Sequence, residues 1–300
     1  MSYETTTEGR FEAVDWNRVG LYAVLAGLVG FYLLPIEAGL VTAFKTTAAY
    51  GDTAPYFPPG PSGVTVQKWA TAFDGLSSGL FNSVLMAVPA TALSAVFGSM
   101  AAYGLTNVDW RGQVGVYVLF IAGIFVPYQA VLVPLKQFWT QWVPLRVWLE
   151  PLWLLPGLVP DHGRLFALTI THVAYGIPIC TLLFRSYYKS LSTEMVEAAK
   201  LDGASVTRIY RRIVLPLSVP MFAVTLIYQF TQIWNDLLFA LILIGGSGEV
   251  GVVTQELIGI GVAMEGTDFP LQMAAAFVTA LPTLLVYVFF GEQFAKGVTS

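Results

Sequence analysis

Apolar residues dominate this chain in six long windows that contain no Asp, Glu, Lys or Arg. A helix that crosses a membrane needs about 20 mostly apolar residues, and each window meets or nearly meets that length. We therefore predict six transmembrane helices, over residues 19–36 with an apolar continuation to 44, 82–105, 112–135, 165–184, 213–235 with a continuation to 244, and 269–291. Six crossings place both termini on one side of the membrane.

Positively charged residues between these windows indicate the orientation. If the N-terminus is cytoplasmic, ten of the 15 Lys and Arg residues fall in cytoplasmic segments, and such segments are normally enriched in these residues. We therefore predict that both termini are cytoplasmic. Residues 1–16 carry several acidic side chains and no basic run before the first window. The first window is therefore predicted to be an uncleaved helix rather than a signal peptide.

The same pattern divides the chain into regions. We predict a cytoplasmic tail over residues 1–17, a first transmembrane helix over 18–44, an extracytoplasmic loop over 45–81 and a core over 82–300. Prolines and glycines make the extracytoplasmic loop irregular, and a short interfacial helix is expected within it over Val66–Phe73.

Composition supports a membrane protein and narrows the partners. Hydrophobic residues make up 56% of the chain and charged residues 11%, whereas soluble domains carry about 25% charged residues. The protein is therefore expected to be a multi-pass protein of the cell membrane. A net charge of −4 without a basic patch gives no sign of nucleic-acid binding. The single cysteine, Cys180, excludes a disulfide framework and a cysteine-based metal site.

The loop between the fourth and fifth windows is unusually polar for this chain. A cap at Ser192 or Thr193 begins a short helix that runs to about Leu201, and Gly203 is suited to end it in the left-handed conformation. A second short helix, capped by Ser205, leads to the fifth window. A segment of this kind suits docking to a soluble partner, although a solvated loop anchored by arginines would show the same local pattern.

A longer motif in this loop carries a family resemblance. Residues 197–220 read EAAKLDGASVTRIYRRIVLPLSVP, which resembles the EAA loop of membrane permeases in binding-protein-dependent ABC importers. Flanking stretches resemble the maltose-type sugar permeases of that family, and the resemblance extends over about residues 80–300. These stretches are Asn82-Ser83-Val84, residues 98–103 (GSMAAY), residues 126–130 (VPYQA), residues 184–188 (FRSYY) and Trp234-Asn235-Asp236.

The resemblance implies an ATP-driven transport mechanism. The loop over about residues 186–215 would act as a coupling helix on a cytoplasmic ATPase dimer, which would bind ATP and Mg²⁺. A second permease subunit, in a heterodimer with this chain, and an extracytoplasmic solute-binding protein would complete the importer. The implied docking residues are Glu197, Ala198, Ala199, Asp202 and Gly203, and Ile213 and Pro216 would form the junction with the fifth helix.

This chain is not expected to hydrolyse ATP or to hold a cofactor itself. It contains no G-x-x-x-x-G-K-[ST] phosphate-binding loop. A partner subunit would therefore supply the hydrolysis, and the chain would be a transport subunit rather than an enzyme.

Polar residues within a membrane segment are functional candidates by default. In the fifth window a translocation pathway would include Gln229, Gln232, Asn235 and Asp236. Counted along a helix from Pro216, Asp236 lies roughly 30 Å away, near the outer interface, where a hydrogen bond between helices would also explain it. His172 in the fourth window is interpreted as a packed, hydrogen-bonded histidine.

Sugar import is the function that these features favour. An importer permease for another small solute is the main alternative, because the EAA loop is shared among importers of many substrates. A secondary transporter is disfavoured, since the windows lack the ionisable residues that such transporters place in the membrane. An intramembrane enzyme is disfavoured because His162 and His172 do not form an H-E-x-x-H motif.

Overall fold

The computed structural model describes residues 15–246, 250–263 and 266–299, and most of these residues are helical. Of the cytoplasmic tail predicted over residues 1–17, residues 1–14 lie outside the described part. Among described residues the only strands form a short antiparallel hairpin, β1 (Val262–Ala263) with β2 (Gly266–Thr267). The predicted all-α class is confirmed.

Four helices are individually long and apolar enough to cross a membrane. They are α1 (Trp16–Ala43), α3 (Gln67–Gly104), α7 (His162–Ser190) and α14 (Phe269–Thr299). Two further helix pairs reach the required length only together, and each pair is sharply bent. If each bent pair is one span, the described residues give the six spans that the sequence predicts, so the count of six and the orientation remain predictions.

The third predicted span, over residues 112–135, is sharply bent. Helix α4 (Gln113–Phe125) ends before Pro127, and the following helical segment turns away by 99°. Val126, which precedes the proline, is extended, as steric conflict with a proline ring favours. The chain then forms short helical turns, α5 (Tyr128–Gln137), η2 (Phe138–Trp142), α6 (Leu145–Trp148) and η3 (Glu150–Leu154).

The fifth predicted span is likewise interrupted. A bend of 75° at Ser218 separates its first helical segment from α11 (Val219–Trp234), and a break at residues 235–237 precedes α12 (Leu238–Leu243). Pro216 and Pro220 flank Ser218, and neither can donate the backbone hydrogen bond that would continue a straight helix. The span predicted over residues 213–235 therefore consists of helical segments joined by a sharp bend.

The second predicted span begins earlier than expected. Helix α3 runs for 38 residues from Gln67, about 57 Å at the α-helical rise, whereas the hydrocarbon core of a bilayer is about 30 Å thick. The separate interfacial helix expected over Val66–Phe73 is instead the first part of α3. Before it, α2 (Thr47–Asp52) and η1 (Pro61–Gly63) form a compact cap.

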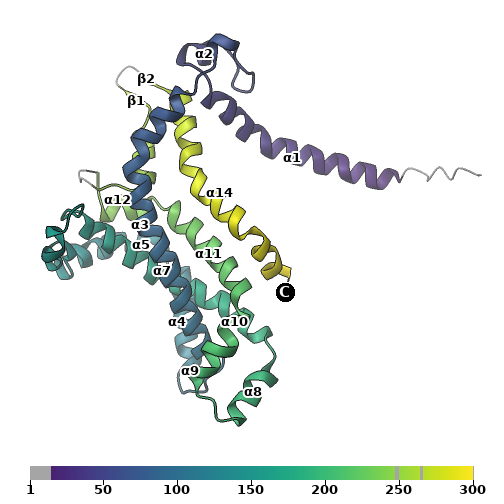
Figure 1. Ribbon diagram of the computed structural model, residues 1–300, viewed down its shortest axis with the longest axis vertical. Helices are drawn as coiled ribbons and strands as arrows, with labels where there is room; N and C mark the ends of the chain where they lie inside the picture. The colour runs from purple at the N-terminus through teal and green to yellow at the C-terminus, as the bar shows by residue number, and fades with distance from the viewer. Residues whose placement is uncertain (1–14, 247–249, 264–265, 300) are drawn as a thin grey trace, which may run out of the picture.

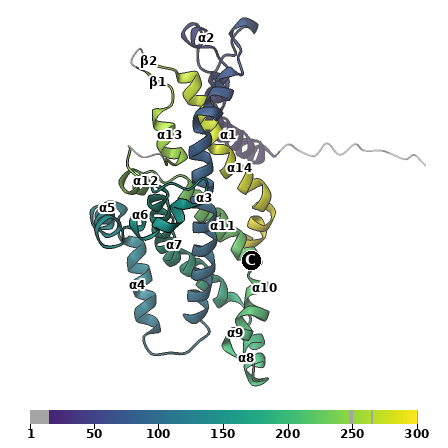
Figure 2. The ribbon, with the colours of Figure 1, turned by 60° about the vertical axis from the view of Figure 1, so that its left-hand side comes forward.

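Helices α3 and α7 pack together along the centre of the bundle because small residues let their backbones approach (Figure 2). A Cβ atom at Gly98 of α3 would overlap the Cβ of Cys180 on α7. A Cβ atom at Gly176 of α7 would overlap Ser94 of α3 and Gln229 of α11. The same contacts bury Cys180, which agrees with the expectation of a structural thiol.

Helix α13 (Val253–Gly259) is attached to α3 by polar contacts. The Glu256 carboxylate accepts hydrogen bonds from Ser78 Oγ at 2.8 Å and from the backbone N–H of Gly79 at 2.9 Å. Asn82 Nδ2 donates to the Gly251 carbonyl, and the Val253 N–H donates to Ser83 Oγ, both at 2.9 Å. These bonds hold the segment before α14 against the long helix.

Different elements form the two ends of the molecule (Figure 1). Helix α2 and the β-hairpin lie at one end. At the other end are α8 (Thr193–Leu201) and α9 (Val206–Ile209). Helix α1 diverges from the bundle toward one side, and its apolar window has no buried residue. Its closest packing is near its C-terminal end, where Gly39 lies against Phe277 and Met273 of α14.

Candidate functional site

The α8–α9 turn has the geometry that the sequence predicts. The Ala204 N–H donates to the Ala199 carbonyl and the Gly203 N–H to the Lys200 carbonyl, both at 3.0 Å. Gly203 has φ +76°, and this combination is the Schellman ending of a helix. Ser192 occupies the N-cap position of α8, although its side chain makes no capping hydrogen bond. Ser205 caps α9 by accepting from the Arg208 N–H.

Four of the five predicted docking residues lie on the exposed surface of this turn. Glu197, Ala198, Asp202 and Gly203 are exposed. Ala199 is half-buried and packs against the protein's own hydrophobic residues. It faces inward because Val196, one turn earlier on the same side of α8, is anchored in that cluster.

Two exposed residues of α8 were missed by the sequence reasoning. Leu201 is 88% exposed and Met195 is 44% exposed. With Ala198 they recur every three residues, so they form one apolar stripe on the helix. That spacing is visible in the sequence, but neither residue is part of the EAA motif from which the docking residues were predicted.

Beneath the turn, a cluster that we call the hydroxyl hub joins three segments. Ser99 Oγ of α3 lies 2.6 Å from Tyr188 Oη of α7 and 2.8 Å from Tyr210 Oη. Tyr210 begins the π-helical turn η4 (Tyr210–Val214) that continues α9. Tyr103 Oη donates to the Val206 carbonyl at 3.1 Å. The hub therefore ties the α8–α9 turn directly to α3 and α7.

The predicted junction residues lie between the hub and the bend at Ser218. Ile213 is half-buried in η4 and packs against the same hydrophobic cluster. Pro216 is exposed in α10 (Leu215–Leu217), two residues before the bend. On α7, Tyr187 Oη donates to the Leu217 carbonyl at 2.7 Å, which fixes α10 to that helix.

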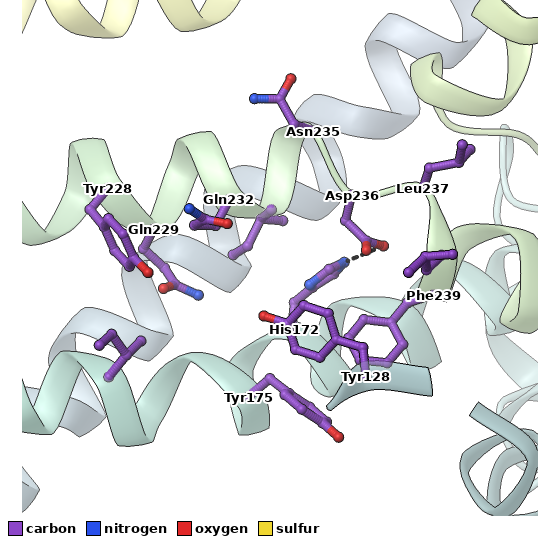
Figure 3. Close-up of a pocket in the computed structure, with 13 residues that line it drawn as sticks. Tyr128, His172, Tyr175, Tyr228, Gln229, Gln232, Asn235, Asp236, Leu237 and Phe239 are labelled. Atoms are coloured by element: carbon purple, nitrogen blue, oxygen red, sulfur yellow. Dashed lines mark ion pairs between the residues drawn. The ribbon is translucent and has the colours of Figure 1, made fainter. Parts of the chain in front are cut away.

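The four predicted pathway residues line one cavity of about 330 Å³ between α7 and α11 (Figure 3). Gln229 is buried, Asp236 is partly buried, and Gln232 and Asn235 are exposed. The Asn235 amide folds back onto the Thr231 carbonyl at 2.9 Å. The sequence reasoning missed the opposite wall, which is aromatic: Tyr128, Tyr175 and Phe239 have ring centroids 5.0–5.3 Å apart.

His172 and Asp236 form a buried pair in the same cavity, which is an ion pair only when the imidazole is protonated. His172 Nε2 lies 3.6 Å from Asp236 Oδ2, and the two side chains are 7% and 10% exposed. His172 is packed as expected, but its Nε2 makes no hydrogen bond. Asp236 is withdrawn from the surface, because the helix ends at Trp234 and the chain turns toward α7. Its contact is with another helix, which is one of the two possibilities that the sequence left open.

Comparison with known proteins identifies the family that has this architecture. The family model described as "Binding-protein-dependent transport system inner membrane component" matches residues 94–299. The xylose/arabinose import permease protein XacI of Haloferax volcanii is 52% identical over 95% of this chain and 93% of its own length. A probable ABC transporter permease protein of Pyrococcus horikoshii is 38% identical over 95% of this chain and 96% of its own.

The fold matches solved structures as well. One is a bacterial ABC transporter involved in the import of the acidic polysaccharide alginate, with a TM-score of 0.64, 17% identity and coverage of 98% of this chain and 100% of that one. The family match and the two relatives cover the α8–α9 turn and the cavity. The chain therefore belongs to the family of inner-membrane components of binding-protein-dependent transport systems.

Proposed function

We propose that this chain is a permease subunit of an ATP-driven importer of a small sugar, and that it couples to a cytoplasmic ATPase through α8. The observation that carries this proposal is an exposed helix turn that is hydrogen-bonded, through the hydroxyl hub, to the two central helices of the bundle. A docking surface without that connection could bind an ATPase but could not transmit its movement.

The exposed face of α8 has the chemistry of a docking surface. Met195, Ala198 and Leu201 present an apolar stripe, and Glu197 and Asp202 add negative charge at its edge. Exposed apolar side chains on a polar rim are typical of protein–protein contacts. Gly203 carries no side chain, and the space around its Cβ position is open, so a partner can approach the turn closely.

Transmission would run from this face into the membrane. A displacement of α8 and α9 moves Tyr210, which is bonded to Ser99, and Ser99 lies on the helix that packs against α7. Helix α7 and α11 border the cavity. Closure of the ATPase dimer on ATP and Mg²⁺, bound by the partner, would thereby alter the cavity walls.

The remaining partners follow from exposed surfaces. Helix α1 has an apolar window that no other described residue of the chain covers, and a second permease subunit would cover part of it together with lipid. The end formed by α2, α13 and the hairpin would face a solute-binding protein outside the cytoplasm. A related fold has been solved with a periplasmic protein bound to an alginate pentasaccharide.

A pentose is the sugar that the Haloferax volcanii relative favours. The relative that is 52% identical bears a name that specifies xylose and arabinose. A cavity of about 330 Å³ is at the small end of the range for ligand pockets, roughly 300–1,000 Å³. Another small solute is the alternative, and the transport assay below would favour it if neither pentose were taken up.

The first experiment is co-purification of the chain with its ATPase, together with uptake of radiolabelled D-xylose and L-arabinose by the complete importer. Leu201→Glu and Glu197→Arg should each lower ATPase recovery and sugar uptake at least about tenfold, because each places a charge against a closely packed contact. Asp109→Arg reverses an exposed charge outside the turn and should behave as wild type.

Three results would contradict the proposal in different ways. Normal assembly and uptake in both variants would remove the docking role of α8. Loss of membrane insertion in both would mean that the residues are needed for folding. Wild-type uptake of neither pentose, with uptake of another solute, would replace the sugar and leave the importer function intact.

A further inference from the structure

We propose that the His172–Asp236 pair recognises adjacent hydroxyl groups of an uncharged monosaccharide held between α7 and α11. This inference rests on the proposed function and adds the side chains that would select the solute. It is carried by two buried polar atoms without a hydrogen-bond partner, His172 Nε2 and Asp236 Oδ2, which belong to residues that line the cavity.

The two atoms lie side by side, and each lacks a hydrogen-bond partner. Buried polar atoms are normally hydrogen-bonded, and leaving one unpaired costs free energy. Their separation of 3.6 Å exceeds the range of an N–H···O hydrogen bond, so neither atom satisfies the other. Adjacent sugar hydroxyls offer a donor for the carboxylate oxygen and an acceptor for an Nε2–H of the imidazole.

The rest of the cavity wall fits the same solute. Tyr128, Tyr175 and Phe239 form the aromatic wall, on which the C–H face of a sugar ring can pack (Figure 3). Gln229 and Gln232 add amide donors and acceptors from α11. This is the combination of a mainly apolar pocket and a few polar groups that fixes the orientation of a small ligand.

The charge of the wall excludes an acidic solute. Among the described residues that line the cavity there is no Lys or Arg, and Asp236 is the single carboxylate. With a neutral imidazole at His172, the wall has no positive charge that would attract a carboxylate or phosphate group. The cavity therefore suits a neutral sugar of monosaccharide size.

The test measures selectivity in the reconstituted complete importer. Uptake of D-xylose is compared with uptake of its monodeoxy analogues at equal loading of the binding protein. In the wild type, at least one analogue should be transported about tenfold more slowly, because it lacks a hydrogen bond to a charged group. In Asp236→Asn and in His172→Gln, that ratio should fall to about one for the same analogue.

A matched control separates recognition from packing. His162 is also buried on α7 but lies outside the cavity, where its Nδ1 accepts from the Val159 N–H at 3.0 Å. His162→Gln should keep the wild-type ratio. If the ratio is unchanged in both cavity variants, the pair only holds α7 to the end of α11, and the inference is overturned.

Uptake of D-xylose and its analogues by the wild-type importer tests the inference even if the variants fail to assemble. Equal uptake of D-xylose and every analogue would overturn the inference while pentose import stands. Wild-type uptake of no neutral sugar would overturn both the inference and the proposed sugar function.

Discussion

Single glycines decide how closely the central helices approach. Gly98 and Gly176 are positions where a Cβ atom would meet atoms of a neighbouring helix. Lipid gives helices little hydrophobic reason to associate, so close van der Waals contact contributes much of the stability of a membrane bundle. These two positions are therefore more sensitive to added volume than exposed apolar residues of the same helices.

Gly98→Ala should destabilise the protein, because the new methyl group overlaps Cys180 and the α7 backbone beside it. Overpacking of this kind costs about 1–3 kcal/mol, which thermal unfolding in detergent would report as a lower midpoint. Gly104→Ala is the control on the same helix, since no atom lies within 4 Å of its Cβ position. Equal midpoints for the two variants would show that α3 and α7 adjust without cost.

Gly203→Ala should weaken the turn through the backbone alone. Gly203 has φ +76° and open space around it, and a non-glycine residue in this region costs about 1 kcal/mol. Hydrogen exchange at residues 203–204 should become faster. Gly115→Ala, in helix α4 with equally open space, should slow exchange in its helix, because alanine favours helix more than glycine. If the exchange rate changed in the same direction in both variants, this explanation would be contradicted.

At the scale of elements, α13 is positioned by the carboxylate that it directs at α3. Glu256 can reach Ser78 Oγ and the Gly79 N–H because Gly79 has no side chain. These contacts fix the segment before α14 against α3. An element of only seven residues has little helical stability of its own, so its position depends on these contacts.

Gly79→Ala should release α13, since the added methyl group would occupy the space of the Glu256 carboxylate. We expect a broader distance distribution between spin labels on α3 and α13, and faster hydrogen exchange over residues 252–258. Gly75→Ala is the matched control one turn away, where the nearest atom is Ile260 Cδ1 at 3.4 Å. An unchanged distribution in Gly79→Ala would mean that other contacts position α13.

At the scale of the whole molecule, the hydroxyl hub connects the exposed turn with the cavity region. Ser99→Ala removes both tyrosine hydrogen bonds and leaves one buried and one half-buried hydroxyl without that partner. The loss of stability should be about 1–3 kcal/mol. If the hub transmits movement, the number of sugar molecules imported per ATP hydrolysed should also fall.

Ser186→Ala, at an exposed position on α7, is the control for the hub and should change neither quantity. Tyr210→Phe and Tyr188→Phe each remove one of the two bonds and should give intermediate effects. A loss of stability in Ser99→Ala with an unchanged ratio of import to hydrolysis would assign the hub to packing alone.

Much of the architecture could be predicted from hydropathy and local capping. The long apolar windows, the end of α8 at Gly203 and the Ser205 cap follow from interactions within a few residues, which sequence spacing records directly. The bends at Pro127 and Ser218 were foreseeable only in part. Proline permits a kink, but the packing of neighbouring helices determines whether and how far the helix turns.

The sequence by itself determined the membrane class, the apolar segments of the long helices and the geometry of the α8–α9 turn, because these depend on local periodicity and capping chemistry. The tertiary structure alone decided that Ala199 faces inward, that Ser99 meets two tyrosines and that Asp236 pairs with His172. Each of these depends on contacts between residues far apart in the chain. Their distances are set by how closely α3, α7 and α11 pack, and no local pattern encodes that spacing.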